Sequence, residues 1–461
     1  MIRRKKMNEK RLNTLANEKV SKAIFKMSIP MVMGMMVQVL YNLVDTYFIG
    51  RLNDTNQLAA ANISFPIFIV FMALAGVMGI GASSYISRAL GKNEKGEADK
   101  TATIALVLCL GLGLIITILG LIFIKSIVIV LGSSNETFIY TYRYVAIMLI
   151  GGVFIMGNFA LGQLLRAEGG AMQSMMGLLI GTVANIVLDP IFIFTFNMQI
   201  TGAALATIVG NFLGFAYYAY VFLSNKTVTK INFKLFSFDK KIIGEILKIG
   251  LPASLNQMLM SVAITVSNNI AVYYGAVVVA GMGVASKIMT IGTFIFMGFS
   301  SGCQPLVGYN YGAKNVERVK EVIKKGIIIT STIGVVLAII FGVFANNLIN
   351  IFINDGEVVK YGTIILRALI LSLPFVGAQM VSTTSVQSMG KALPALILSI
   401  SRQGILYIPL ILILNLVGGF TGFIYAQPIT DLIMLILCII VLLIILNRDA
   451  IMLVREKEII K

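Results

Sequence analysis

Long apolar runs divide the chain, and they restrict its possible folds more than any other feature. They lie at about residues 26 to 50, 58 to 86, 101 to 124, 138 to 163, 172 to 196, 201 to 224, 246 to 274, 277 to 306, 326 to 346, 360 to 386, 394 to 415 and 421 to 446. A helix needs about 20 apolar residues to cross a hydrocarbon core of about 30 Å. Every run is long enough, so the sequence predicts an all-α polytopic membrane protein with twelve transmembrane helices.

The composition excludes a soluble globular protein, because 58% of the residues are hydrophobic and only 12% are charged. The formal net charge of +17 would otherwise suggest nucleic acid as a partner. The basic residues, however, lie in the short gaps between the apolar runs and not on one compact face. We therefore expect a lipid bilayer around the chain, no nucleic acid partner, and a monomer.

The lysines and arginines also predict the orientation. If the N-terminus is cytoplasmic, 31 of the 37 fall on the cytoplasmic side, five fall on the outer side, and Lys287 lies inside a span. We expect a multi-pass protein of the bacterial inner membrane with both termini in the cytoplasm. The expected parts are a cytoplasmic segment at 1–25, an N-lobe at 26–224, a cytoplasmic linker at 225–245, a C-lobe at 246–446 and a cytoplasmic tail at 447–461.

The two sets of six spans repeat each other weakly. FKMSIP ending at Pro30 matches LKIGLP ending at Pro252, LGKN at 90–93 resembles YGAKN at 311–315, and TGAALA at 201–206 resembles TGFIYA at 421–426. The interval between the matching motifs is nearly the same in all three cases. Because six spans is an even number, both halves start on the same side. The repeat therefore predicts two six-helix lobes related by a pseudo-two-fold axis along the membrane normal, with a substrate pathway between them.

The residues available for chemistry are few. The chain has no histidine, and Cys109, Cys303 and Cys438 each stand alone in an apolar run. A membrane-embedded enzyme would need a nucleophile with a base or a metal cluster, so we expect no enzyme activity and no cofactor. Three carboxylates, Asp45, Asp189 and Asp431, fall well inside predicted spans, where each costs about 2.5 to 3.5 kcal/mol.

Two of these aspartates sit among other polar residues at helical spacing. Gln38, Tyr41, Asn42 and Asp45 share one face of the first span, and Asn185 lies one turn before Asp189 in the fifth. Pro190 has no N–H for the Ile186 carbonyl, which adds a free oxygen there. In the sixth span, Thr207 lies one turn before Asn211. Carboxylate, amide and carbonyl oxygens suit Na⁺ or a trapped proton, although a hydrogen bond to a neighbouring helix could also account for either aspartate.

Other charged residues in the spans are harder to interpret. Lys287 is either a lysine whose amine reaches the membrane surface or a residue of the substrate pathway. Asp431 is open to a structural role or a role in the pathway. Arg143, Arg367 and Arg402 are expected to reach the interface. Arg143 and Arg367 are separated by nearly the same interval as the repeated motifs, which is another sign of the repeat.

The order and spacing of several segments resemble the MATE family, the multidrug and toxic compound extrusion transporters. The resemblance covers about Phe25 to Leu446 and is carried by SIPMVMGMMVQVLYNLVDTYFIGRL, GIGASSYISRALGKNE, LLRAEGGAMQS, NIVLDPIFIF, KIGLPASLNQ and QPLVGYNYGAKN. It implies a twelve-helix, two-lobe antiporter that exports amphipathic, often cationic, organic compounds against inward H⁺ or Na⁺.

The resemblance also assigns residues. Asp45 matches the first-span aspartate of the DinF-like branch, and Asn185, Asp189 and Thr207 match its cation site in the N-lobe. The stretches where the NorM-like branch carries acidic residues, LPASLNQMLMSV and LPFVGAQMVSTTSVQ, contain no Asp or Glu here, and Ser267 stands at the repeat position of Asp45. The expected substrate pathway comprises Gln38, Tyr41, Asn42, Asn211, Asn256, Gln257, Lys287 and Asp431.

The sequence therefore predicts a cation-coupled efflux antiporter with a possible Na⁺ site at Asp45, Asn185, Asp189 and Thr207. Export or flipping of a lipid-linked or other specific metabolite is the alternative within the same fold, and it would favour a more basic cavity. An ion channel is the remaining alternative. The choice between H⁺ and Na⁺ stays open at this point.

Overall fold

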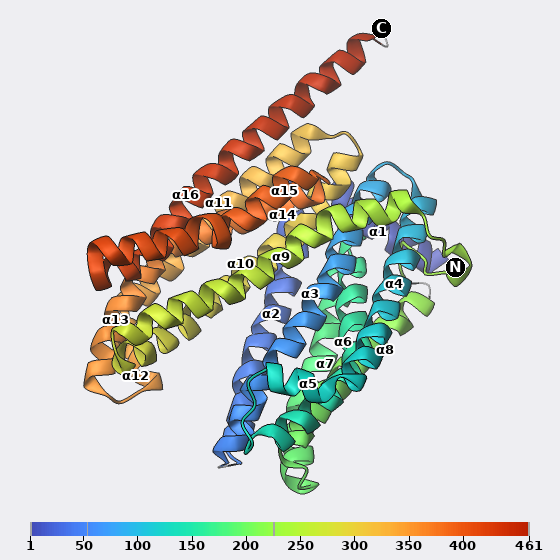
Figure 1. Cartoon of the computed structure of the whole chain (residues 1–461). Coiled ribbons are helices and arrows are strands. Elements are labelled where there is room, and N and C mark those ends of the chain that lie inside the picture. Colours follow the sequence, from blue (N-terminus) through green and yellow to red (C-terminus); the bar gives the residue numbers. More distant parts are fainter. Residues whose placement is uncertain (1, 53, 225, 460–461) are drawn as a thin grey trace. The chain divides into compact units, whose positions relative to one another are not determined.

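The computed structural model describes residues 2–52, 54–224 and 226–459, without the side chains of residues 2–8, 42, 46 and 452–459. Within these ranges the chain is helical and has no strand (Figure 1). It divides into two compact units, each with its own hydrophobic core. Unit 1 comprises Met1–Thr14 and Met33–Leu251, and unit 2 comprises Leu15–Val32 and Pro252–Lys461.

Unit 1 consists of long helices joined by short turns. Its elements are α1 (Ile2–Ala16), α2 (Val20–Gly50), α3 (Thr55–Gly91), α4 (Lys95–Ile122), α5 (Ile124–Val130), α6 (Phe138–Ala167), α7 (Ala171–Pro190), the π-helical turn η1 (Ile191–Thr195), α8 (Gln199–Leu223), the 3₁₀ turn η2 (Phe233–Leu235) and the start of α9 (Lys240–Tyr273). The end of α1 and the first part of α2 belong to unit 2.

Unit 2 repeats this plan. Besides the rest of α9 it contains α10 (Ala276–Gly312), α11 (Val316–Val343), α12 (Ala345–Phe352), α13 (Gly356–Leu369), the 3₁₀ turn η3 (Ile370–Ser372), α14 (Leu373–Ser388), α15 (Ala392–Ile400), the π-helical turn η4 (Ser401–Tyr407) and α16 (Ile408–Ile459).

The described residues form 11 segments long and apolar enough to cross a membrane, and the last of them contains two spans. This segment, Ala392–Ile451, has 60 residues, or about 90 Å if it were one straight helix. It is broken at Gly419, whose φ of 57° and ψ of −139° are not helical. A Cβ on Gly422 would lie 1.8 Å from the Leu414 carbonyl oxygen, so the chain folds tightly back here (Figure 1). The twelve predicted spans are therefore confirmed.

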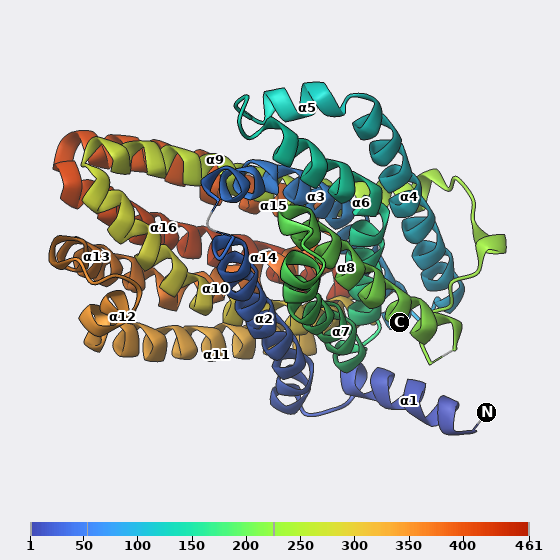
Figure 2. The ribbon, with the colours of Figure 1, turned by 90° about the horizontal axis from the view of Figure 1, so that it is seen from below.

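Local structure also repeats between the units. The motifs LGKN and YGAKN form the same turn, with Asn93 at φ 63° and Lys314 at φ 57°. Both units contain a short helix that hydropathy did not predict, α5 in unit 1 and α12 in unit 2. Figure 2 shows α5 as a short segment between α4 and α6 at the edge of unit 1. The interval between their first residues, Ile124 and Ala345, agrees with that of the sequence repeat.

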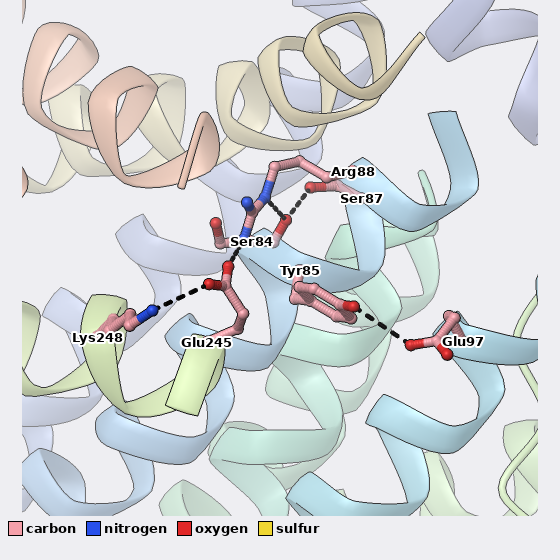
Figure 3. Close-up of polar contacts among 7 residues, drawn as sticks. All are labelled: Ser84, Tyr85, Ser87, Arg88, Glu97, Glu245 and Lys248. Atoms are coloured by element: carbon pink, nitrogen blue, oxygen red, sulfur yellow. Dashed lines mark hydrogen bonds and ion pairs between the residues drawn. The ribbon is translucent and has the colours of Figure 1, made fainter. Parts of the chain in front are cut away.

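The start of α9 packs directly on α3 within unit 1. A Cβ on Gly250 would come 1.9 Å from the Val77 carbonyl oxygen, so the two backbones touch where this glycine lies. Next to this contact, Arg88 of α3 forms an ion pair of 3.2 Å with Glu245, which also pairs with Lys248 (Figure 3). These contacts make the first turns of α9 part of unit 1.

The segment predicted to be a linker, 225–245, is fastened to unit 1 along its described length. The Lys230 amide donates to Asp99 Oδ1 over 2.7 Å, and the Asn232 amide donates to Thr103 Oγ1 over 3.1 Å. Both acceptors lie near the start of α4. The division between the units consequently falls at Leu251 and Pro252, inside α9.

A buried ion pair holds α1 on unit 1. Arg11 is 7% exposed and pairs with Glu168, which is fully buried in the turn between α6 and α7. Glu168 also accepts hydrogen bonds from the Thr229 amide and hydroxyl, each at 2.8 Å. Burial raises the pKa of the Glu168 carboxyl, whereas Arg11 and the Thr229 donors lower it. One carboxylate thus joins three segments of the unit.

Residues 15–32 pack inside unit 2, although the sequence placed 26–32 in the N-lobe. Ser28 Oγ donates to the Phe299 carbonyl over 3.3 Å, and Asn310 Nδ2 donates to the Leu15 carbonyl over 2.9 Å. A Cβ on Gly302 would lie 2.3 Å from Ser28 Oγ, so this glycine lets the first part of α2 approach α10 closely.

Unit 2 contains a buried charged cluster that corrects one expectation. Arg402 was predicted to reach the membrane interface, and this is wrong: its Nε donates to Asp431 Oδ1 over 3.1 Å. Asp431 is fully buried and also accepts from Gln427 Nε2 at 2.9 Å, while its backbone carbonyl accepts from Gln379 Nε2. The cluster joins η4, α14 and α16.

Replacing Arg11 with Leu should leave a buried carboxylate without its cation. We expect a loss of about 3–5 kcal/mol at neutral pH, because the uncompensated charge stays buried. Without Arg11 the folded-state pKa of Glu168 rises further above its unfolded value, so the loss should be smallest at about pH 5 and grow as the pH increases through that raised pKa toward about pH 8. Thermal unfolding of the detergent-purified protein at both pH values measures this. The exposed neighbour Lys10, replaced with Leu, is the control, and an equal loss at both pH values would contradict the interpretation.

Replacing Arg402 with Leu should cost about 3–5 kcal/mol, because Asp431 then remains buried and unpaired. A double variant, Arg402→Leu with Asp431→Leu, should recover most of this stability, since neither charge is left inside the unit. Thermal unfolding of the two variants, with Arg367→Leu as an exposed-arginine control, makes the comparison. A double variant less stable than Arg402→Leu alone would show that the pair is not the source of the effect.

Candidate cation site

The candidate cation site lies within unit 1, on α2, α7 and α8. Asp45 comes from α2, Asn185 and Asp189 from α7, and Thr207 from α8. Glycines allow α7 and α8 to approach: a Cβ on Gly210 would lie 2.6 Å from the Gly181 carbonyl oxygen and 3.1 Å from Asn185 Cβ. This close packing places the polar side chains of α7 against Thr207.

Pro190 ends α7 as an α-helix, and the chain continues as the π-helical turn η1. The sequence predicted a disturbance of the helix here, because proline cannot donate a backbone hydrogen bond. The π geometry itself was not predicted. Single π-helical turns are frequent at functional sites, and this one directly follows Asp189.

Thr207 is the centre of the hydrogen bonds at the site. Asn185 Nδ2 donates to its hydroxyl over 3.4 Å, and the Tyr41 hydroxyl lies 3.5 Å from the same oxygen. Asn211 Nδ2 donates to the Thr207 carbonyl over 2.9 Å. Asn158 of α6 extends this chain by donating from Nδ2 to Asn211 Oδ1 over 3.1 Å.

The acidic side chains of the site lack donors. Asp45 Oδ1, Asn185 Oδ1 and both carboxylate oxygens of Asp189 are buried without a hydrogen-bond donor among the described residues. Asp189 is fully buried. Its carboxyl group and that of Asp45 lie within hydrogen-bonding reach of each other, and Tyr144 of α6 is close to both.

A bound cation would compensate these four buried oxygens, which have no hydrogen-bond donor. A proton shared between the carboxyl groups of Asp45 and Asp189 would turn one of them into a donor to the other. The same set, two carboxylates with an amide and a hydroxyl oxygen, also consists of the hard oxygen ligands that Na⁺ prefers. The residues present therefore fit either coupling ion.

The predicted residues fall into two groups. The structure brings Asp45, Asn185, Asp189 and Thr207 together, with Tyr41 and Asn211 next to them, whereas Gln38 is half-buried on the same helix as Asp45. The side chain of Asn42 lies outside the described part of the chain. The predicted pathway residues of unit 2 are Asn256 and Gln257, both half-buried, Lys287, which is exposed, and Asp431, which pairs with Arg402.

Unit 2 has a neutral contact at the repeat position of Asp45. Ser267 is buried there and accepts a hydrogen bond from the Tyr407 hydroxyl over 3.3 Å. Tyr407 ends η4, the π-helical turn of this unit. The backbone irregularity is thus repeated, but the carboxylate pair is not.

Sequence reasoning missed Asn158, Tyr144 and the Arg402 partner of Asp431. Asn158 was the one with a usable signal, an amide inside an apolar span. Tyr144 is less conspicuous, because tyrosine is common near membrane interfaces. The contact between Arg402 and Asp431 depends on which spans are neighbours, and the sequence does not state this.

Comparisons with known proteins agree with the fold and its repeat. A family model described as MatE matches residues 30–191 and 252–413, two stretches that begin at the prolines of the repeated motifs, Pro30 and Pro252. The multidrug export protein MepA of Staphylococcus aureus strain MSSA476 is 33% identical over 425 residues, covering 92% of this chain and 94% of the relative.

Two solved structures are similar over nearly the whole chain. A MATE crystal structure in complex with MaL6 superposes with a TM-score of 0.91 at 30% identity, over 95% of this chain and 98% of the other. An outward-facing multidrug resistance MATE family transporter of the MOP superfamily gives a TM-score of 0.90 with the same identity and coverage. The chain is therefore a multi-pass membrane protein and belongs to the MATE family of transporters.

Proposed function

We propose that this transporter exports amphipathic, often cationic, organic compounds in exchange for an inward cation bound at Asp45, Asn185, Asp189 and Thr207. The observation that carries the proposal is the set of buried acidic oxygens without donors in the described part of unit 1. The export of drugs is supported by the similarity to MepA, a multidrug export protein. The positive-inside pattern supports a cytoplasmic position for both termini.

The coupling ion acts through the two aspartates. Ionising both carboxyl groups together is unfavourable at this separation, so they take up a cation as a coupled pair. Binding of H⁺ or Na⁺ removes the repulsion between the carboxylates of Asp45 on α2 and Asp189 on α7. Release of the cation restores this repulsion. The Thr207 hydroxyl forms hydrogen bonds with Asn185 and Tyr41, and these contacts position α8, the third helix of the site.

The positions of the acidic residues support a place for this chain in the DinF-like branch of the family. The two aspartates lie in unit 1, and Ser267 with Tyr407 occupies the matching place in unit 2. Because neither of those side chains is a carboxyl group, we infer that coupling uses unit 1.

Replacing Asp45 or Asp189 with Asn should abolish coupling. Asn keeps the shape of the side chain but cannot take up a proton or supply a negative charge, so we expect active drug efflux to fall by about 100-fold or more in each variant. Proteoliposomes loaded with a fluorescent organic cation, energised in turn by a pH gradient and by a Na⁺ gradient, measure this and identify the ion.

Asp355→Asn is the matched control, because Asp355 caps α13 through Glu357 and Val358, and asparagine is an equally good cap. It should transport as the wild type does. Normal gradient-driven efflux by the two site variants, at wild-type levels of folded protein, would refute the proposed coupling site. Downhill flux without exchange would instead indicate a channel.

A further inference from the structure

Three large apolar side chains are exposed in the segment of unit 1 that connects α8 to α9. Phe233 is 67% exposed, Leu235 40% and Phe238 75%. The ring of Phe238 packs edge-on against that of Phe236, with the ring centroids 5.2 Å apart. A single exposed apolar side chain is ordinary on a protein surface, whereas a group of them marks a contact with another molecule or with lipid.

Contacts at both ends hold this segment on α4. At its start, the backbone amides of Lys230 and Asn232 donate to side chains of the first turns of α4. At its end, Asp239 Oδ2 accepts from Lys100 Nζ over 2.7 Å, and Asp239 Oδ1 accepts from the Ile242 amide at the start of α9 over 3.3 Å. The turn η2 packs on α4 between these two attachments (Figure 2). The exposed apolar side chains therefore belong to a fixed surface.

The attachments also define the depth of the segment in the membrane. The charged residues of α4 all lie in its first part, Lys95–Lys100, and the rest of this span, from Thr101 to Ile122, has none. The change from charged to apolar residues marks the level at which a helix enters the hydrocarbon. Lys100 and Thr103 lie on the two sides of this change, and both bind the segment. The segment consequently lies at the level of the lipid headgroups.

The segment carries a net positive charge at this level. Asp239 is the one acidic residue between positions 226 and 241, and Lys100 compensates it. Lys234, Lys240 and Lys241 are exposed and form no ion pair with any residue that the structure describes. Exposed phenylalanine and leucine side chains among unpaired lysines are typical of segments that lie in the interface of an anionic membrane.

The depth of the segment favours lipid over a protein partner. A water-soluble protein would have to reach apolar side chains at the level of the headgroups, where lipid already surrounds the span. Lysine side chains are long enough to keep their amines at the phosphates while neighbouring apolar side chains enter the hydrocarbon. Both kinds of side chain in the segment therefore fit a lipid surface at once.

We propose that residues 232–241 bind anionic phospholipids, with the three exposed apolar side chains between the upper parts of the acyl chains and the three unpaired lysines on the phosphates. This inference goes beyond the proposed export function and depends on neither the substrate nor the coupling ion. Under the proposed orientation the lipids are those of the cytoplasmic leaflet. Because Asp239 caps α9, the contact holds the first turn of this helix at the membrane surface.

A single fluorescent probe tests the contact. The chain contains no tryptophan, so Phe238→Trp introduces one indole into the full-length protein, at an exposed position. Phospholipids brominated in the upper part of the acyl chains quench an indole that they contact. In vesicles of such lipids we expect strong quenching for Phe238→Trp and little for the control Glu94→Trp. Glu94 is exposed just before α4, about 9 Å farther than Lys100 from the apolar part of the helix.

The lysines should make the contact selective for anionic lipid. Quenching of Phe238→Trp by brominated phosphatidylglycerol and by brominated phosphatidylcholine in mixed vesicles measures the preference between the two lipids. We expect phosphatidylglycerol to be preferred by about fivefold or more, the effect of one lysine at an anionic surface. Adding Lys234→Gln, Lys240→Gln and Lys241→Gln should reduce this preference to within about twofold.

A matched control removes the same charge elsewhere. Lys22→Gln, Lys324→Gln and Lys360→Gln together remove three exposed lysines of unit 2 and should leave the preference of Phe238→Trp unchanged. Quenching of Phe238→Trp no stronger than that of Glu94→Trp would overturn the proposal, since the segment would then face water or protein. Equal quenching by the two lipids, or a preference that survives the loss of Lys234, Lys240 and Lys241, would also overturn it.

Discussion

Inside a bilayer no water is available to solvate a charge, and this constraint separates structural from functional polar groups in this protein. The buried carboxylate Asp431 accepts hydrogen bonds from Arg402 and Gln427, so side chains of its own unit compensate its charge. Asp189 is also buried and Asp45 is half-buried, yet both Asp189 carboxylate oxygens and Asp45 Oδ1 lack donors among the described residues. The first arrangement compensates its charge within the fold, whereas the second fits the bound cation that we propose. The proposed coupling therefore depends on the carboxylates of the site and equally on the lack of hydrogen-bond donors to them.

Much of the fold was predictable because hydropathy is a strong signal over the length of a span. Hydropathy identified all twelve spans, matching sequence motifs identified the internal repeat, and the cost of placing Asp45 and Asp189 inside spans identified the candidate site. Contacts between side chains of different spans were harder to predict from the sequence. Asp431 was recognised as unusual, but its partner Arg402 was expected at the membrane surface, since nothing in the sequence shows that η4 and α16 are neighbours.

The other features that the sequence did not predict are short helices, long-range contacts and local distortions of helices. The helices α5 and α12 have 7 and 8 residues, too few for a hydropathy window of span length to detect. The Arg11 and Glu168 pair joins α1 to a turn 157 residues away, and only the folded chain brings them together. Pro190 predicted a break in α7, but a proline does not say whether a kink or the π-helical turn η1 follows.

Three helices, α1, α2 and α9, cross the division between the units, and the crossings in α2 and α9 each lie at or near a proline. Pro30 lies near the boundary at Val32 and Met33 in α2, and Pro252 is the first residue of the unit 2 part of α9. These prolines end the repeated motifs FKMSIP and LKIGLP. A proline inside a helix removes a hydrogen bond and allows bending at that point. Because Asp45 lies on the same helix as Pro30, the cation that we propose at Asp45 would bind to one of the three helices that cross between the units. Ser267, on α9, offers no such charge change.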